Sequence, residues 1–281
     1  MARKTSRKAT SRKPSRRTAR TAPRRTAHAH RKARTGKSAQ VKGPKKRTTA
    51  DAKPAAGKKP AAGKVPQMTS AEIEEAFRRF QAAMPEPEGE LEHLNPFTLL
   101  VAVVLSAQAT DAGVNKATPA LFAAADTPAK MAALGEAQVR DFIKTIGLFR
   151  TKAKNVVALS KQLVEQHAGE VPRTREALES LPGVGRKTAN VVLNIAFGEP
   201  TIAVDTHIFR VGNRTGMAPG KNPFEVEMRL EQVVPASYKR HAHHWLILHG
   251  RYVCLARRPR CENCVIADLC KWTDKTGVSI Q

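Results

Sequence analysis

Apolar residues recur every three or four positions along most of the chain beyond residue 67, and this spacing predicts amphipathic helices. Ser70 can cap a first helix that extends to Phe80. Asn95 and Pro96 form a cap and first turn ahead of an apolar helix that ends near Ser106. No segment alternates as a strand would, so we expect an all-α body made of short helices. Further helices are predicted over residues 152–167, 174–181 and 186–197, and a loop over residues 107–115.

The first 67 residues do not follow this pattern. They contain no Leu, Ile, Phe, Trp or Tyr, and they hold 23 of the 49 lysines and arginines but one of the 24 acidic residues. Such a segment cannot bury enough apolar surface to offset the entropy lost on ordering, so we expect it to be disordered. It can act as a solvated linker, as a non-specific DNA tether with a steep salt dependence, or as an organelle transit peptide. A further interpretation places the true start of a shorter protein at Met68.

The net charge of the whole chain is +25, and its isoelectric point is about 10.5. This excess favours a polyanionic partner, either a nucleic acid or an anionic membrane surface. Because most of it lies in the first 67 residues, it says little about the body of the protein. No apolar run approaches the roughly 20 residues that cross a bilayer, and the N-terminus lacks the apolar core of a secretory signal. We therefore expect nucleic acid as the partner and no membrane.

A short Gly-Val-Gly turn, residues 183–185, separates two predicted helices, and Val184 can pack back between them. Exposed backbone N–H groups next to a helix start favour a phosphate, although a plain helix corner would show the same glycines. Lys187 follows in the first helical turn, where the helix dipole and partial burial would both disfavour its charged form. A partly neutral lysine can act as the nucleophile on a sugar carbon. A charged, phosphate-binding lysine is the alternative.

Asp205 precedes another predicted helix and is placed to cap it, with Val204 and Phe209 as the accompanying hydrophobic contact. Catalysis is compatible with capping, because the second carboxylate oxygen can stabilise positive charge on a sugar that loses its base. His207 can meet a lesion or a phosphate, although a structural histidine is the more common case. Four more histidines lie in the apolar segment 241–249, which indicates a packed helix rather than a metal site.

All four cysteines lie within 17 residues, with the spacing Cys-x6-Cys-x2-Cys-x5-Cys. Such clustering is typical of a metal or cluster site in a reducing compartment. Four thiolates can hold Zn²⁺ or a [4Fe–4S] cluster. Zinc modules usually pair two Cys-x-x-Cys segments, and only one is present, so we favour the cluster. Its ligands would be Cys254, Cys261, Cys264 and Cys270, and ligation would pin a basic loop that holds Arg257 and Arg258.

Several segments together match a known family: LSAQATD at 105–111, LPGVGRKTANVVLN at 181–194, TIAVDTHIFR at 201–210 and HHWLILHGR at 243–251, followed by the four-cysteine spacing. From about residue 70 to 271 the chain resembles the bacterial endonuclease III family. Its members are bifunctional DNA glycosylases and abasic-site lyases of the helix–hairpin–helix superfamily. The resemblance implies removal of oxidised pyrimidines from double-stranded DNA, by a monomer in the bacterial cytoplasm at the nucleoid. The basic tail is outside the family pattern.

The resemblance also implies two helical domains with a DNA-binding cleft between them. The six-helix domain with the hairpin would cover residues 89–199, and the cluster domain residues 68–88 plus 200–281, with 1–67 as a disordered basic tail. Lys187 matches the nucleophile of the family and Asp205 its carboxylate. The DNA contacts we expect are Gln108, Leu148, Leu181, Gly183, Val184, Gly185, Arg186, His207, Arg257 and Arg258, and the expected substrate pocket holds Ser106 and Asp111.

Two other functions are compatible with parts of the pattern. An adenine-specific mismatch glycosylase shares the hairpin and the cluster, but it generally lacks a lysine at the position of Lys187. It also carries a further C-terminal domain, for which the 11 residues after Cys270 leave no room. A non-catalytic DNA-compacting protein would use the basic tail as its active part.

Overall fold

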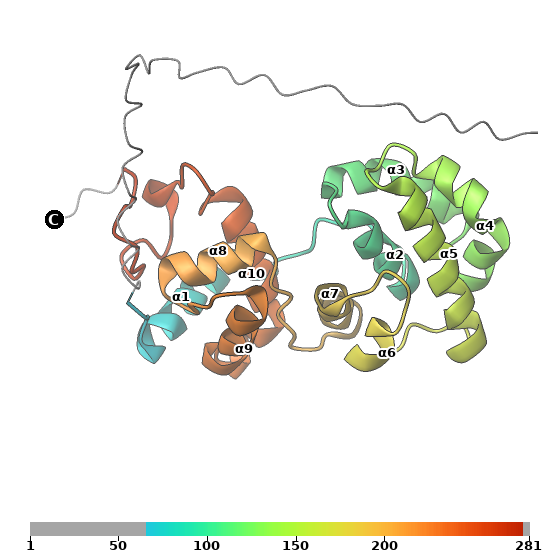
Figure 1. Ribbon diagram of the computed structural model, residues 1–281. Coiled ribbons are helices and arrows are strands. Elements are labelled where there is room, and N and C mark those ends of the chain that lie inside the picture. The colour runs from blue at the N-terminus through green and yellow to red at the C-terminus, as the bar shows by residue number, and fades with distance from the viewer. Residues whose placement is uncertain (1–65, 278–281) are drawn as a thin grey trace, which may run out of the picture. The chain divides into compact units, whose positions relative to one another are not determined.

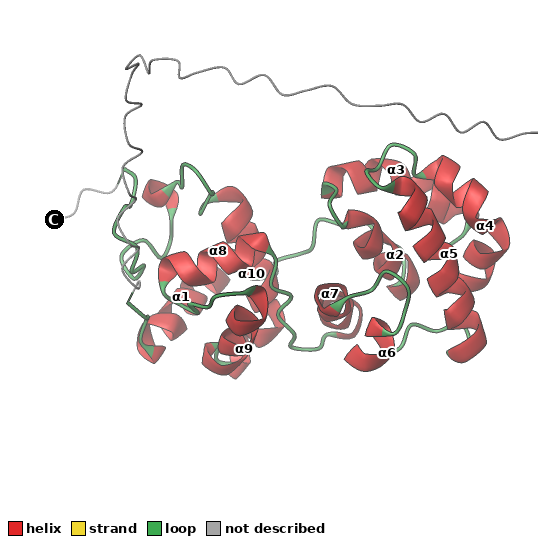
Figure 2. Cartoon of the chain, in the orientation of Figure 1, coloured by secondary structure: helices red, strands yellow, loops and turns green. Residues whose placement is uncertain are grey.

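The computed structural model describes residues 66–277 (Figure 1). The basic segment 1–67 lies outside the described residues except for its last two positions, so its disorder stays a prediction. Every regular element from 66 to 277 is a helix, and the all-α prediction is confirmed (Figure 2). The elements are α1 (Ser70–Ala83), α2 (Pro96–Ser106), α3 (Asp111–Ala124), α4 (Pro128–Phe142), α5 (Phe149–Gln166), α6 (Arg175–Glu179), α7 (Arg186–Phe197), α8 (Thr206–Thr215), α9 (Pro223–Val233) and α10 (Lys239–Tyr252), with short 3₁₀ helices η1 (Ala236–Tyr238) and η2 (Cys261–Asn263).

Most of these helices begin at a polar side chain that caps the free N–H groups of the first turn. Asn95 accepts the N–H of Thr98 at 2.9 Å, and the Thr98 hydroxyl accepts the N–H of Asn95 in return, so the predicted cap of α2 is confirmed. The predicted cap of α1 is wrong by one residue. Thr69 caps this helix instead of Ser70, because Thr69 forms a reciprocal capping box with Glu72.

The loop predicted over residues 107–115 is shorter in the structure. Thr110 accepts the N–H of Gly113 at 3.1 Å, and α3 therefore begins at Asp111. The small residues that suggested a loop are compatible with the first turn of a helix once Thr110 caps it. As a result Asp111 sits at a helix start.

Besides a small third cluster, the buried side chains form two large hydrophobic clusters, which divide the chain unevenly. One lies within residues 97–193 and is built from α2 to α7. The other combines α1 with buried residues between 202 and 266. The chain thus contributes α1 to the second cluster, then forms the first cluster with residues 97–193, and contributes to the second cluster again from residue 202 onward. This distribution supports the proposed six-helix domain over 89–199 and the proposed second domain over 68–88 plus 200–281.

Helix α1 and the residue Met68 ahead of it are tied to segments about 150 to 190 positions later in the sequence. The guanidinium of Arg79 contacts the carboxylate of Asp268 at 2.6 Å, and the Phe77 ring stacks on Tyr238 with centroids 5.9 Å apart. The backbone N–H of Met68 donates to the carbonyl of Gly216 at 2.9 Å. Figure 1 shows the cyan α1 beside α8 and α10, and these helices share the second hydrophobic cluster.

Buried amides on α7 join the two clusters. Asn190 is 0% exposed; it donates to the Glu227 carboxylate at 3.0 Å, and its carbonyl accepts the Thr201 hydroxyl at 2.6 Å. One turn later, the Asn194 amide donates to the carbonyls of Thr201 and Arg240, both at 3.1 Å. These bonds hold α7, which belongs to the first cluster, against elements of the second. The apolar pattern of α7 did not indicate them.

Lys152 is an exception to the apolar core. It lies on the buried face of α5, is 5% exposed, and its Nζ has no hydrogen-bond partner among the described residues. Burial lowers the pKa of this ammonium, because the charged form loses its hydration. A buried cation without a partner destabilises the folded state.

Lys152→Met should stabilise the fold at pH 7 by about 1–3 kcal/mol, because it removes the buried charge and retains most of the side-chain length. The folded-state pKa is the lowered one, so the unfolded chain binds the proton more tightly. The destabilisation is therefore present at neutral pH and disappears as the pH rises towards the ordinary value of 10.5. The measurement is the free energy of unfolding in urea at several pH values. Lys161→Met, on the exposed face of the same helix, is the control and should give no gain. Equal or lower stability of Lys152→Met at pH 7 would contradict the expectation.

Candidate active site

The predicted hairpin joins α6 to α7. Gly183 has a φ of 80°, and a Cβ there would lie 2.8 Å from the Asn155 side chain, so any other residue would strain the backbone and displace Asn155. Gly185 is the N-cap of α7 and provides no side-chain cap, which leaves the first N–H groups of α7 available to an anion. Leu181 and Val184, both expected to contact DNA, have buried side chains at 2% and 7% exposure. Their side chains are therefore not available for such a contact, and their N–H groups already donate within the hairpin, to the carbonyls of Leu178 and Leu181, both at 3.1 Å.

Lys187 is the second residue of α7, as predicted. It lines a cavity whose walls come from α2, α3, α7 and α10. Ser106 and Asp111 line the same cavity, so the structure brings together the expected nucleophile and the two expected pocket residues. The expected partial burial of Lys187 is wrong, because the residue is exposed. What distinguishes it is that it directly follows the hairpin and lines this cavity.

Asp205 caps α8 as predicted. Its Oδ1 accepts the N–H groups of His207 and Ile208, both at 2.8 Å, and Oδ2 makes no hydrogen bond within the described part of the chain. Asp205 is not among the residues that line the Lys187 cavity. The packing nevertheless joins their segments, because Val191, one turn after Lys187, shares a small buried cluster with Ala203, two residues before Asp205.

Two histidines of α10 also line this cavity, which the sequence did not reveal. The packed helix predicted there is confirmed, with His243 at 3% and His244 at 7% exposure. Burial, and then the neighbouring His244 ring and the cations Lys187 and Arg251, lower the pKa of His243 to about 3. Burial lowers the pKa of His244 to about 4. Both rings are therefore neutral near pH 7 and can offer hydrogen bonds without adding charge. An apolar helix pattern conceals such residues, because it does not tell which buried positions meet a cavity.

Arg251 and Glu90 are further cavity residues to which the sequence assigned no function. The Arg251 guanidinium donates to the Asp111 carboxylate at 2.5 Å and forms a second ion pair with Glu90. The Tyr252 hydroxyl also donates to Glu90. These bonds connect the end of α10 to the start of α3 at the edge of the cavity. Asp111 is thus a paired carboxylate in the cavity wall.

Gln108 and Leu148, expected to contact DNA around an extruded nucleotide, share an unusual backbone conformation. Their φ values are 54° and 59°, in the left-handed region that non-glycine residues rarely adopt. Leu148 is 59% exposed, and Gln108 is also exposed. Their loops are neighbours, because a Cβ on Gly147 would lie 3.7 Å from the Gln108 carbonyl oxygen. The structure therefore presents both side chains to solvent from adjacent loops.

The remaining expected DNA contacts are dispersed. Arg186 is half-buried and paired with Glu227 at 2.8 Å, so its charge is already partly neutralised. The Nδ1 atom of His207 lies 3.2 Å from the Arg210 guanidinium. Arg257 and Arg258 are exposed in the loop between the first two cysteines.

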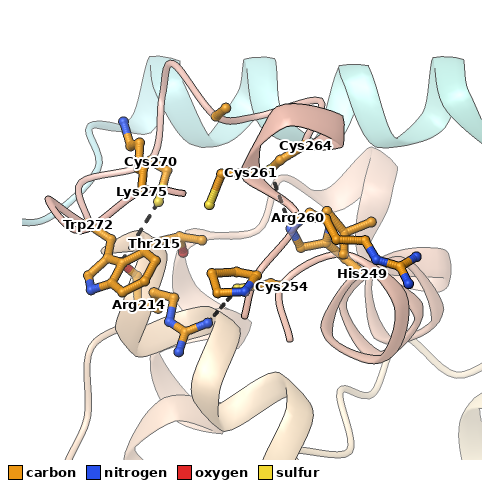
Figure 3. A pocket seen from close by; sticks show the side chains of 13 residues that line it. Arg214, Thr215, His249, Cys254, Arg260, Cys261, Cys264, Cys270, Trp272 and Lys275 are labelled. Atoms are coloured by element: carbon orange, nitrogen blue, oxygen red, sulfur yellow. Dashed lines mark hydrogen bonds between the residues drawn. The ribbon is translucent and has the colours of Figure 1, made fainter. Parts of the chain in front are cut away.

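The four cysteines line a single cavity, shown in Figure 3. None is in a disulfide. Burial raises the pKa of the Cys264 thiol to about 11 and also raises that of Cys270. Four thiolates in such a place need metal cations to balance them. The donor set and its convergence therefore fit a [4Fe–4S] cluster held by Cys254, Cys261, Cys264 and Cys270.

Known protein families match the two parts of this arrangement. Residues 101–236 match the HhH-GPD superfamily of base excision DNA repair proteins, and residues 254–270 match the iron-sulfur binding domain of endonuclease III. The first match contains the hairpin, Lys187 and Asp205, and the second contains the cysteines. Fold and site thus define a helix–hairpin–helix DNA repair protein with an iron–sulfur domain.

Curated relatives narrow this class. Endonuclease III of Escherichia coli (strain K12) is 58% identical over 211 residues, which is 75% of this chain and 100% of the relative. Endonuclease III of Haemophilus influenzae (strain Rd) is 58% identical over 201 residues, 72% of this chain and 95% of the relative. The chain belongs to the endonuclease III family.

Solved structures agree with this assignment. A trapped covalent endonuclease III–DNA intermediate, described as an estranged-adenine complex, and a non-covalent endonuclease III–DNA complex each give a TM-score of 0.68. Each is 44% identical, and the match covers 73% of this chain and 96% of theirs. A thermostable thymine-DNA glycosylase gives a TM-score of 0.65 at 25% identity, over 71% of this chain and 95% of its own.

The protein is accordingly a base-excision repair enzyme, a DNA glycosylase with abasic-site lyase activity, and it carries a [4Fe–4S] cluster. The iron–sulfur cofactor predicted from the cysteine spacing is thereby confirmed. None of the helices between residues 66 and 277 has both the length and the apolar character that crossing a membrane requires.

The two hairpin glycines should respond differently to alanine. Gly185→Ala should fold normally, because a Cβ there meets nothing within 4 Å. It should still weaken binding to undamaged and damaged duplex alike if a phosphate approaches this backbone closely. Gly183→Ala should instead lower the melting temperature, because of its positive φ and the Asn155 contact. Calorimetry and fluorescence anisotropy with duplex DNA measure the two effects. If a folded Gly185→Ala protein binds DNA with the affinity of wild type, the hairpin is not part of the DNA interface.

Proposed function

We propose that this enzyme removes oxidised pyrimidines through covalent attack by Lys187 and then cleaves the strand by β-elimination. The observation that carries this proposal is the position of Lys187. It directly follows the hairpin, in the first turn of α7, and it lines the same cavity as Ser106 and Asp111. The hairpin, the proposed nucleophile and a cavity lined by the proposed pocket residues are thus adjacent.

The reaction begins with extrusion of the damaged nucleotide, because its sugar carbon is inaccessible inside the base stack. Gln108 and Leu148 support this step, since both are exposed on neighbouring loops in a sterically costly backbone conformation. A side chain held in this way can occupy the space that the extruded nucleotide leaves. The N–H groups at the start of α7 bind a nearby phosphate and hold the strand in register.

In the chemical step, the neutral amine of Lys187 attacks C1′ and forms the C1′–Nζ bond. The bond from C1′ to the base breaks, and the base leaves with the electron pair and takes up a proton. Asp205 stabilises the positive charge on the sugar through Oδ2, which helix capping leaves unused. After ring opening, the resulting Schiff base acidifies C2′. Loss of a C2′ proton expels the 3′ phosphate with the C3′–O3′ electron pair, and water then releases the lysine.

Recognition of the base falls to the neutral groups of the cavity. His243 and His244 can hydrogen-bond to the polar edge of an oxidised pyrimidine without an added charge. The Arg251 bonds to Asp111 and Glu90 hold the wall on which this edge would lie. The cluster is bound in a separate cavity, and we assign it a structural function there.

We further propose that the substrate is double-stranded DNA with damaged bases or abasic sites, and that the enzyme acts as a monomer. Its relatives in Escherichia coli and Haemophilus influenzae support a bacterial setting. Because its proposed substrate is DNA, we place its action at the nucleoid. The exposed Arg257 and Arg258 would contact the phosphate backbone as part of this interface.

Borohydride should trap a covalent adduct between the full-length enzyme and duplexes that contain thymine glycol, other oxidised pyrimidines or a plain abasic site. Lys187→Ala should form none, because it lacks the amine that becomes the Schiff base. Lys161→Ala, which removes an exposed lysine from α5, should trap as wild type does. The adducts are counted after denaturing electrophoresis.

An adduct that persists in Lys187→Ala would overturn the assignment of the nucleophile. Trapping at the abasic site but at no oxidised pyrimidine would retain the lyase chemistry and overturn the proposed lesion class.

Asp205→Asn separates catalysis from capping. Asparagine caps helices about as well as aspartate, so the melting temperature should stay near that of wild type. The single-turnover rate of base release should fall roughly 10²–10³-fold, because the charge opposite the sugar is lost. Asp205→Ala should show the same loss of rate and also lose about 1 kcal/mol of stability. A rate within threefold of wild type for Asp205→Asn would exclude the electrostatic function.

A further inference from the structure

Arg214, near the end of α8, contacts the first cysteine segment at three points. Its Nη1 donates to the carbonyl of Leu255 at 2.6 Å, and its Nη2 donates to the carbonyl of Ala256 at 3.0 Å. Nη1 also lies 3.5 Å from the Sγ atom of Cys254. Figure 3 shows this guanidinium directed at Cys254 from the α8 side of the cluster cavity.

The position of this guanidinium is well determined by its surroundings. It lies over the Trp272 ring at 4.4 Å, so an aromatic face covers the side that the carbonyls leave open. The backbone of the same residue meets the last cysteine, because the Arg214 carbonyl lies 3.9 Å from the Sγ atom of Cys270. One residue therefore touches both ends of the four-cysteine segment.

The loop that Arg214 holds is the one that presents Arg257 and Arg258. This loop contains few hydrogen bonds between backbone groups. The N–H groups of Leu255 and Arg260 both donate to the carbonyl of Val253, each at 2.9 Å. The carbonyls of Leu255 and Ala256 are bonded by Arg214 instead. A planar guanidinium can bond two carbonyls and a sulfur together, which a lysine ammonium on a flexible chain does less well.

The same contacts act on the cluster electrostatically. A cation that donates towards a ligating sulfur stabilises the more negative, reduced form of a cluster and so raises its reduction potential. We propose that Arg214 is a positioning residue that couples the cluster to the basic loop: it holds residues 255–258 in place and raises the reduction potential through the same guanidinium. The DNA-binding consequence rests on the proposed function of Arg257 and Arg258.

The test uses the full-length holoenzyme and three variants. Arg214→Gln removes the charge and the three contacts, and Arg214→Lys keeps the charge but not the planar geometry. Arg140→Gln is the matched control, because it removes one arginine from the exposed end of α4, whose buried residues belong to the other hydrophobic cluster. Film voltammetry measures the reduction potential, and trypsin cleavage after Arg257, followed by mass spectrometry, measures the hold on the loop.

Arg214→Gln should shift the potential to a more negative value and speed cleavage after Arg257 severalfold, whereas Arg140→Gln should change neither. Arg214→Lys should keep a potential close to wild type and be cleaved as fast as Arg214→Gln. If only the potential or only the cleavage rate changes in Arg214→Gln, the coupling is overturned. If Arg214→Gln loses the visible absorption of the cluster, the Arg214→Lys variant is used instead. Cleavage after Arg257 that is faster than in wild type, in an Arg214→Lys protein that retains the absorption, supports the coupling. Cleavage at the wild-type rate in that protein overturns it.

Binding to undamaged duplex distinguishes this inference from the proposed interface. Arg214→Gln should weaken binding severalfold, as should the double variant Arg257→Ala and Arg258→Ala. If the double variant binds as wild type does, the loop is not part of the DNA interface. The voltammetry and the cleavage assay would then still decide whether Arg214 couples the loop to the cluster.

Discussion

The site depends on the buried amide bonds that fasten α7 between the two hydrophobic clusters. Asn190 and Asn194 lie one turn apart, and both are buried, so their polar groups must find partners inside the protein. They find them on Thr201, Glu227 and Arg240, which belong to the part of the chain that follows α7. Leaving one such group unpaired costs about 1–3 kcal/mol. The hairpin and Lys187 at the start of α7 therefore have a defined position relative to Asp205.

Most of the other titratable groups that line the Lys187 cavity are either paired with an opposite charge or neutral. Arg251 pairs with Asp111 and Glu90, which leaves these carboxylates occupied at the cavity edge. Burial and neighbouring cations keep His243 neutral. Neutral hydrogen-bonding groups suit recognition of an uncharged base, because no ion must lose its hydration when the base enters.

The cysteine segment is subject to a different constraint. Thiolates are unfavourable in a buried site, as the raised pKa of Cys264 indicates, and iron supplies the compensating charge. The loop from Cys254 to Cys261 contains few backbone hydrogen bonds of its own. Ligation at its ends and the Arg214 contacts in between together limit its movement. Exposed arginines on such a loop lose less entropy when they bind a phosphate.

The sequence by itself determined the features that depend on a few neighbouring residues. Helix caps such as Asn95 and Asp205, the hairpin glycines and the cysteine spacing act through local backbone geometry, and the structure shows each of these caps and turns where the residues predicted them. The resemblance in motifs added the family, because several such local features occurred in one order. The assigned functions of Lys187 and Asp205 still stay predictions.

Only the tertiary structure decided which distant residues meet. Arg251 and Asp111 are 140 positions apart, and nothing in either segment indicated their ion pair. His243 looked like an ordinary core position, and Lys187 proved exposed where partial burial was expected. The physical reason is that burial and pairing depend on how helix faces pack against one another, and an amphipathic pattern specifies a buried face but not its neighbour.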